Sequence, residues 1–209
     1  MPAQDRLRYG CQHPSSVVFV VARDFDVTVA ELRVVARYAA ESADQVLPLF
    51  ERAHPRDTRP RAAISAAWTF AEGAPRTNLQ RAAALEAHRA AKTATGEAAK
   101  QAARAAGDAA AAAYLHPLAR STQAGHILRA AACGARAAEL SAGDDPAVGD
   151  ASIEEACRRA PAVLIDILSR YPPAPTGKSR TAQLMANLDT LLRSSPAPSG
   201  LQGQASESS

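Results

Sequence analysis

The most densely charged segment of the chain, residues 50–61, holds the side chains best suited to binding a charged partner. Arg59 and Arg61 stand on either side of a proline that restricts the backbone, so their planar guanidinium groups could be presented together to a carboxylate or a phosphate. Glu51 and Asp57 are the acidic residues of the same segment. Alternatively, Asp57 caps a helix and one of the arginines pairs with Glu51, which would hold two helices together. We therefore treat these four residues as candidates for partner binding, with the structural role as the alternative.

Histidine and cysteine side chains could ligate a metal or attack a substrate, but their spacing supports neither role. The histidines are His13, His54, His88, His116 and His126, and the cysteines are Cys11, Cys133 and Cys157. No two histidines are four residues apart on a predicted helix, and no cysteine or carboxylate completes a local ligand set. The cysteines lack the close pairs of a zinc site or a disulfide framework, and nothing in the sequence brings Cys133 or Cys157 to a base. We expect no metal, no cofactor and no catalytic residue.

A third motif, Gly177-Lys178-Ser179, ends like a phosphate-binding loop. That loop requires a glycine at the position where this chain has Pro172, and it follows a strand, whereas the segment before it here has helical periodicity. Ser179 is better read as the N-cap of the last helix. The sequence therefore argues against nucleotide binding of this type.

Helices must position these side chains, because residues 79–140 consist largely of alanine. Of these 62 residues 26 are alanine, which has the highest intrinsic helix propensity. Within this stretch polar residues fall at i, i+3, i+4, i+7 and i+11, which is one stripe of a helix: Glu97, Lys100, Gln101, Arg104 and Asp108. The wide alanine face can be buried, and its methyl groups allow close helix packing. We expect helical charges at this density to form a solvated face.

Local signals mark where other helices begin and end. Thr28 and Glu31 have the spacing of a capping box at the start of the first helix. Asn78 can cap a helix that starts at the next residue, and residues 144–149 are interpreted as a loop. Pro161 should kink or break the helix that contains it.

The helix expected between Pro60 and Glu72 contains Trp68, the only tryptophan of the chain. Ile64, Ala67, Trp68 and Ala71 share one face of that helix. Because large aromatic side chains are mostly buried in small domains, we interpret Trp68 as a core anchor and not as a ligand-stacking residue.

These signals together predict an all-α fold, a compact array of short antiparallel alanine-rich helices without a sheet. We expect one domain over residues 27–194, because this length can bury a single sizeable core. Residues 1–26 lack helical periodicity and are predicted to be a partly ordered extension. Residues 195–209 are rich in Ser, Pro, Gly and Gln and are predicted to be a disordered tail.

Composition excludes several classes of protein. The net charge of +3, from 24 basic and 21 acidic residues, is too small for a committed nucleic-acid binder, although residues 79–140 form a mildly basic belt. That belt lacks interleaved aromatic rings for stacking, so nucleic acid is not the expected partner. No apolar run is long enough to span a membrane or form a signal peptide. Unpaired cysteines favour reduced thiols in a cytoplasm.

Several segments taken together resemble a family of small bacterial proteins described as putative immunity proteins. The resemblance covers approximately residues 28–193. It rests on Arg37-Tyr-Ala-Ala-Glu-Ser, Val46-Leu-Pro-Leu-Phe-Glu51, Asp57-Thr-Arg-Pro-Arg-Ala-Ala-Ile64, Ala87-His-Arg-Ala-Ala91, Ala105-Ala-Gly-Asp-Ala109, Tyr114-Leu-His-Pro117, Gly125-His-Ile-Leu128 and Arg170-Tyr-Pro-Pro-Ala-Pro175. The resemblance implies an all-helical domain that binds and neutralises a toxin of a polymorphic toxin system, and it supplies no catalytic residues.

Two functional hypotheses follow from the sequence. The first is a non-enzymatic binding protein, a toxin-neutralising immunity protein that occludes a cognate toxin with a preformed helical surface. The alternative is a nucleic-acid-associated or DNA-repair accessory protein, or an enzyme whose site is assembled from residues distant in sequence. An enzyme should show a deep pocket with convergent titratable groups, whereas a binding protein needs only a surface patch of about 800 Å².

Overall fold

The computed structural model describes residues 25–194, and within them it contains helices and no strand. The α-helices are α1 (Val29–Asp44), α2 (Leu47–Ala53), α3 (Arg59–Ala71), α4 (Asn78–Thr93), α5 (Glu97–Ala111), α6 (Ser121–Ser141), α7 (Pro146–Arg159), α8 (Ala162–Ser169) and α9 (Arg180–Ser194), and a 3-10 helix, η1, spans Ala112–Tyr114. The predicted all-α class is confirmed. The predicted extension, residues 1–26, lies outside the described residues apart from its last two, and the predicted tail, residues 195–209, lies outside them entirely.

Capping side chains determine where the helices begin. The capping box predicted for α1 is present: Thr28 Oγ1 accepts a hydrogen bond from Glu31 N at 3.2 Å, and Glu31 accepts one from Thr28 N at 2.7 Å. At α4 the prediction was wrong, because Thr77 and not Asn78 is the N-cap. Both residue types can cap, so residue type alone does not separate them. The loop predicted for residues 144–149 is shorter than expected, because Asp145 caps α7 through Ala147 N at 3.0 Å.

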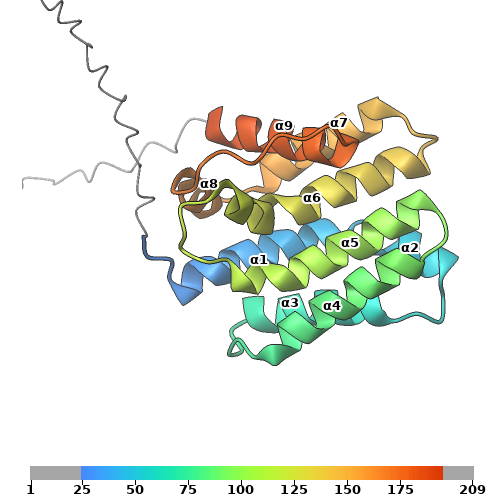
Figure 1. The fold of residues 1–209 in the computed structure, drawn as a ribbon, viewed down its shortest axis with the longest axis horizontal. Coiled ribbons are helices and arrows are strands. Elements are labelled where there is room, and N and C mark those ends of the chain that lie inside the picture. Colours follow the sequence, from blue (N-terminus) through green and yellow to red (C-terminus); the bar gives the residue numbers. More distant parts are fainter. Residues whose placement is uncertain (1–24, 195–209) are drawn as a thin grey trace, which may run out of the picture.

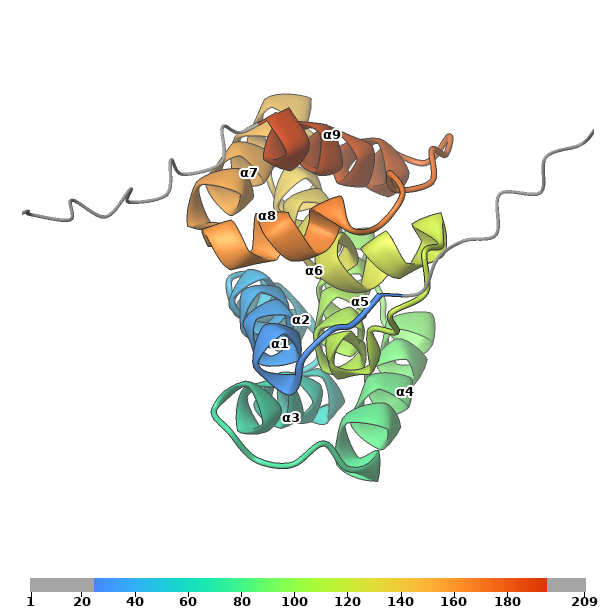
Figure 2. The same cartoon turned by 90° about the vertical axis from the view of Figure 1, so that its left-hand side faces the viewer.

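Helix α5 lies in the interior of the molecule. Figure 1 shows α4, α5 and α6 side by side with alternating directions, and α1, α2 and α3 also contact α5. Helices α7 and α9 pack on α6 and on each other, while α8 contacts α1 and α9 (Figure 2). The chain therefore surrounds one helix with neighbours on several sides.

Alanine makes this central position possible. Ten of the 15 residues of α5 are buried, and seven of them are alanine. Small side chains let neighbouring helix axes approach closely on more than one side of α5. Larger side chains fill the spaces farther out, and the largest fully buried ones include Tyr38, Phe50, Phe70, Ile127, Leu164 and Leu188. The core is thus a layer of methyl groups with larger aliphatic and aromatic side chains around it.

Trp68 occupies a different environment from the one that the sequence predicts. The side chain is half-buried at the edge of the core, and its Nε1 donates a hydrogen bond of 2.6 Å to Asp44 at the end of α1. The Arg37 guanidinium lies 5.2 Å from the centre of the indole ring. Phe70, 1% exposed, is the aromatic core residue of α3 instead. The buried face of α3 is rotated toward Phe70, which leaves Trp68 on its flank.

An ion-pair network attaches the outer helices to α6. The carboxylate of Glu139, whose side chain is 1% exposed, accepts a hydrogen bond of 2.9 Å from Arg180 of α9 and also pairs with Arg136. Arg180 reaches Asp150 of α7 at 2.8 Å as well. Gly149 lets α7 approach, because a β-carbon there would lie 2.0 Å from a Glu139 oxygen. A buried charge is tolerated here because two guanidinium groups compensate it.

Candidate functional site

The four residues predicted to bind a partner pair with one another at the connection between α2 and α3. Arg61 donates two hydrogen bonds of 2.6 Å to Glu51, in the bidentate geometry of strong guanidinium–carboxylate pairs. Arg59 donates bonds of 2.9 and 2.6 Å to Asp57, and its guanidinium lowers the pKa of that carboxyl. The structural role that the sequence offered as the alternative is therefore realised in part, with Arg61 pairing with Glu51. A role in partner binding stays a prediction.

The polar stripe of α5 is the part of the sequence whose environment differs most from expectation. We expected a solvated face, but Gln101 and Asp108 are only 8% and 6% exposed. Helices α4 and α6 pack along both sides of α5 and cover the two residues. Arg104, on the same stripe, remains exposed. The stripe therefore combines an exposed residue, Arg104, with two buried polar residues, Gln101 and Asp108.

Asp108 is the centre of a cluster contributed by three helices. Its Oδ1 atom lies 3.7 Å from His88 Nε2 on α4 and 3.6 Å from Arg129 Nη1 on α6. The thiol of Cys133, also on α6, lies 3.8 Å from the same carboxylate. Burial raises the pKa of Asp108, although Arg129 and His88 act in the opposite direction. Burial raises the pKa of the Cys133 thiol as well, so this cysteine is a poor nucleophile.

A glycine allows the histidine to reach this cluster. A β-carbon at Gly107 would lie only 2.7 Å from Cε1 of the His88 ring, so the ring lies directly against the backbone of α5. The packing of α4 on α5 thus depends on the Gly107-Asp108 pair: the glycine admits the ring, and the aspartate faces its Nε2 atom.

The cluster lines an open pocket of about 410 Å³. Its lining residues are His88, Gln101, Arg104, Asp108, Arg129, Cys133, Ser179 and Thr181. The last two belong to the start of α9, where Ser179 Oγ accepts a hydrogen bond from Ala182 N at 3.2 Å, as predicted for an N-cap. The pocket has the size of a ligand site and combines buried polar groups with exposed cations.

A second pocket, of about 300 Å³, adjoins the first because His88 lines both. It contains Leu85, which is 54% exposed, together with Tyr114, His116 and His126. The guanidinium group of Arg81 lies 5.0 Å from the centre of the Tyr114 ring. This pocket thus combines exposed arginine and leucine side chains with a half-buried tyrosine, and arginine and tyrosine are enriched among the residues that dominate protein interfaces.

Sequence reasoning did not bring these residues together, because they are far apart along the chain. A usable signal was present in α4, where residues at i, i+4, i+7 and i+11 form one stripe: Arg81, Leu85, His88 and Lys92. A similar stripe on α6 consists of His126, Arg129, Cys133 and Arg136. Their convergence on the stripe of α5 depends on how each helix is rotated about its axis, which periodicity does not specify.

The groups described here provide no metal site. Among residues 25–194, no set of three or more histidine, cysteine, aspartate and glutamate side chains could hold a metal ion. No helix in this described part of the chain is both long and apolar enough to cross a membrane.

The described residues form an all-helical body in which polar side chains from three helices converge on open surface pockets. A family model described as Imm-5 like putative immunity protein matches residues 27–163, and the chain therefore belongs to this family. The comparison with curated proteins found no match, and neither did the comparison with solved structures. Membership of an immunity-protein family suggests a non-enzymatic role and a toxin as the partner.

Four of the segments that carry the family resemblance contribute to the two pockets. They supply His88, Asp108, Tyr114 with His116, and His126. All four segments lie inside the matched range of residues 27–163. Ser179 and Thr181, which complete the first pocket, lie beyond it.

Proposed function

We propose that this protein is a non-enzymatic immunity protein that neutralises a cognate toxin by binding it through one face of α4, α5 and α6. This surface, the α4–α5–α6 face, comprises Arg81, Leu85, His88 and Lys92 of α4, Lys100, Gln101 and Arg104 of α5, and His126 and Arg129 of α6. The observation that carries the proposal is the convergence of the three stripes on two adjoining pockets with exposed cations and an exposed leucine.

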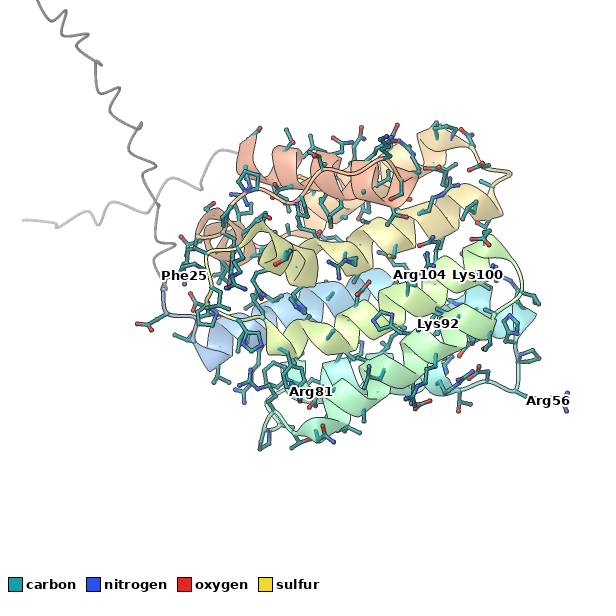
Figure 3. All side chains as sticks on the ribbon, in the orientation of Figure 1. Phe25, Arg56, Arg81, Lys92, Lys100 and Arg104 are labelled. Carbon is teal, nitrogen blue, oxygen red and sulfur yellow. The ribbon has the colours of Figure 1, made fainter. Side chains whose placement is uncertain are left out.

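The charges of this face indicate an acidic partner surface. Figure 3 shows Arg81 and Lys92 on α4 and Lys100 and Arg104 on α5, spread along two neighbouring helices. The side chains of Lys92 and Arg104 make no ion pair or hydrogen bond within residues 25–194, so both charges are available to a partner. Lys100 is paired with Glu97 at 2.6 Å. Opposite charges on a partner would increase the association rate and determine orientation.

Rigidity supports the same proposal. The face lies on three helices that pack through alanine, and its central helix is buried among its neighbours. A surface held in this way is already in its binding conformation, so little ordering entropy is lost on association. Occlusion of a toxin then requires complementary shape and charge, and no chemical step by this protein.

Co-expression tests this function. The neighbouring reading frame is expressed in a bacterial host, and growth is measured with and without this protein. We expect the wild-type protein to restore growth and the double variant Lys92→Glu with Arg104→Glu to fail, with association weakened by about 2 kcal/mol or more, roughly thirtyfold. Both side chains are exposed and unpaired, so circular dichroism and the unfolding midpoint should match wild type.

A matched pair of arginines on the other candidate surface provides the control. Arg52 and Arg56 belong to the charged segment at the α2–α3 connection. Their side chains are exposed and form no ion pair or hydrogen bond within the described residues. The double variant Arg52→Glu with Arg56→Glu should retain full protection. Loss of protection in this variant alone would transfer the binding surface to the segment that contains Glu51, Asp57, Arg59 and Arg61.

Nucleic-acid binding is the alternative that a basic face must be tested against. The aromatic ring that borders the face, Tyr114, is already covered by Arg76 and Arg81, whose guanidinium groups lie 5.4 and 5.0 Å from the ring centre. The α4–α5–α6 face therefore offers few uncovered aromatic rings on which nucleic-acid bases could stack. We expect no change in the fluorescence anisotropy of a labelled oligonucleotide at about 150 mM salt, and tight salt-dependent binding would favour the alternative.

A further inference from the structure

The pocket around Asp108 contains features that a flat docking surface does not need. Gln101 lines this pocket and is only 8% exposed, yet its Oε1 atom has no hydrogen-bond partner. A buried polar atom without a partner is unfavourable, so it is usually found where a ligand or water completes it. The pocket therefore retains an unmet hydrogen-bond acceptor in its wall.

The second feature is the arrangement of the cations. The side chain of Arg104 is exposed and makes no ion pair or hydrogen bond within the described residues. Arg129 is held 3.6 Å from Asp108, so its guanidinium keeps a defined position at the pocket while 42% of its side chain stays exposed. The hydroxyl-bearing residues Ser179 and Thr181 complete the lining at the N-terminal end of α9, where the helix dipole also favours an anion. These groups converge on a volume that an oxyanion can occupy.

The charge balance indicates which oxyanion fits. Two guanidinium groups face one carboxylate, so the pocket has a single positive charge to neutralise, apart from any charge on His88. A carboxylate carries one negative charge, whereas a phosphate monoester carries nearly two at neutral pH. An acidic residue of a polypeptide supplies the carboxylate and, through its backbone N–H, the donor that Gln101 lacks.

We infer that this pocket is the specificity pocket of the α4–α5–α6 face and that it receives the carboxylate of one aspartate or glutamate side chain of the protein partner. Arg104 and Arg129 bind the carboxylate, Asp108 positions Arg129, and Gln101 accepts a hydrogen bond from the backbone of the bound segment. This inference rests on the proposed function for the source of the carboxylate, but the chemistry of the pocket can be tested without the toxin.

The first experiment uses small probes. Backbone and arginine Nε signals of the isotopically labelled full-length protein are followed by NMR during titration with N-acetyl-glutamate N′-methylamide, N-acetyl-glutamine N′-methylamide or inorganic phosphate. We expect saturable shifts at the pocket residues with the glutamate probe, which carries one side-chain carboxylate, with Kd on the order of 1 mM, and no saturation with the glutamine probe, which is neutral. Arg104→Gln should weaken binding at least tenfold, whereas Arg120→Gln, a change at an exposed arginine outside the pocket, should not alter it.

Each other result contradicts the inference. Equal affinity for the acid and the amide, or no saturable shift with any probe, removes the oxyanion site. Tighter binding of phosphate than of the carboxylate assigns the pocket to a phosphorylated ligand instead. Unchanged binding in Arg104→Gln removes its assigned contact.

The second experiment separates this inference from the proposed function. In the co-expression assay, Arg104→Gln should protect growth less well than wild type, because toxin binding is weakened at least tenfold, while Arg120→Gln should protect as wild type does. Full protection by Arg104→Gln alongside protection by wild type would overturn the pocket inference and leave the immunity function intact. Failure of the wild-type protein to protect would count against the proposed function, and the NMR titration would still decide the chemistry of the pocket.

Discussion

Asp108 is a charged residue in the interior whose partners are themselves close to solvent. The side chains of His88 and Arg129 are 37% and 42% exposed, against 8% for Asp108. Water can therefore stabilise the two partners if the carboxylate is removed, whereas the carboxylate has lost most of its own hydration. Because of this asymmetry, we expect the charge of Asp108 to reduce the stability of the folded protein. We assign to Asp108 the role of positioning Arg129.

The pH dependence of stability tests this view. The pKa of Asp108 is raised in the folded protein, so its contribution to stability is complete below the unfolded pKa, about 3.9, and is lost as the pH rises through the folded value. We expect Asp108→Asn, which cannot ionise, to gain about 1 kcal/mol relative to wild type between pH 4 and pH 7, measured by urea unfolding. Glu154→Gln, at an exposed position on α7, should show no such trend. A constant difference between Asp108→Asn and wild type would mean that burial does not penalise this carboxylate.

At the scale of elements, Glu31 connects the first helix to the end of α8. Besides closing the capping box of α1, its carboxylate accepts a hydrogen bond of 2.5 Å from Arg170. Arg170 and the backbone of Thr28 together lower the pKa of Glu31 to about 2. Arg170 also donates a hydrogen bond to the backbone carbonyl of Asp26. One guanidinium group therefore connects the segment before α1, the first turn of α1 and the end of α8.

Removing the Glu31 charge should show this connection in the acid range. Because the folded pKa is depressed, the stabilisation is present above the unfolded pKa of about 4.3 and is lost as the pH falls toward about 2. We expect Glu31→Gln to cost about 1 kcal/mol at pH 7 and almost nothing at pH 2, as measured by thermal unfolding. Glu72→Gln at the exposed end of α3 is the control. An equal loss for Glu31→Gln at both pH values would assign its effect to packing.

The sequence predicted most of these elements because their signals are local. The capping box of α1 and the break at Pro161 each depend on residues within one turn. The incorrect predictions have a different physical origin. Trp68 and Phe70 lie two positions apart on α3 and so point to nearly opposite sides of the helix. Which ring is buried depends on how α3 is rotated against α1, α4 and α5. The cluster around Asp108 depends on three such rotations at once.

At the scale of the whole molecule, the alanine content determines how closely the helices can pack. Ala106 in the middle of α5 is fully buried, whereas Ala82 on α4 is exposed. We expect Ala106→Leu to destabilise the protein by about 1–3 kcal/mol, because the added methylene groups must displace a neighbouring helix. Ala82→Leu should change stability by no more than about 0.5 kcal/mol. Similar urea midpoints for the two variants would show that the interior has room for larger side chains.

The central position of α5 also determines which amide protons can exchange with solvent and when. Helices α1, α2, α3, α4 and α6 all contact α5, so its interior amides can be exposed only when most of the molecule comes apart. Fraying of the outer helices α7, α8 and α9 would leave α5 protected, and deuterium should enter its central turns at the rate of global unfolding. The walls that α4, α5 and α6 contribute to the pocket around Asp108 therefore persist in every partly opened state that leaves these helices together. Such states would keep Arg104, Asp108 and Arg129 in place, while the pocket would lose the wall contributed by the start of α9.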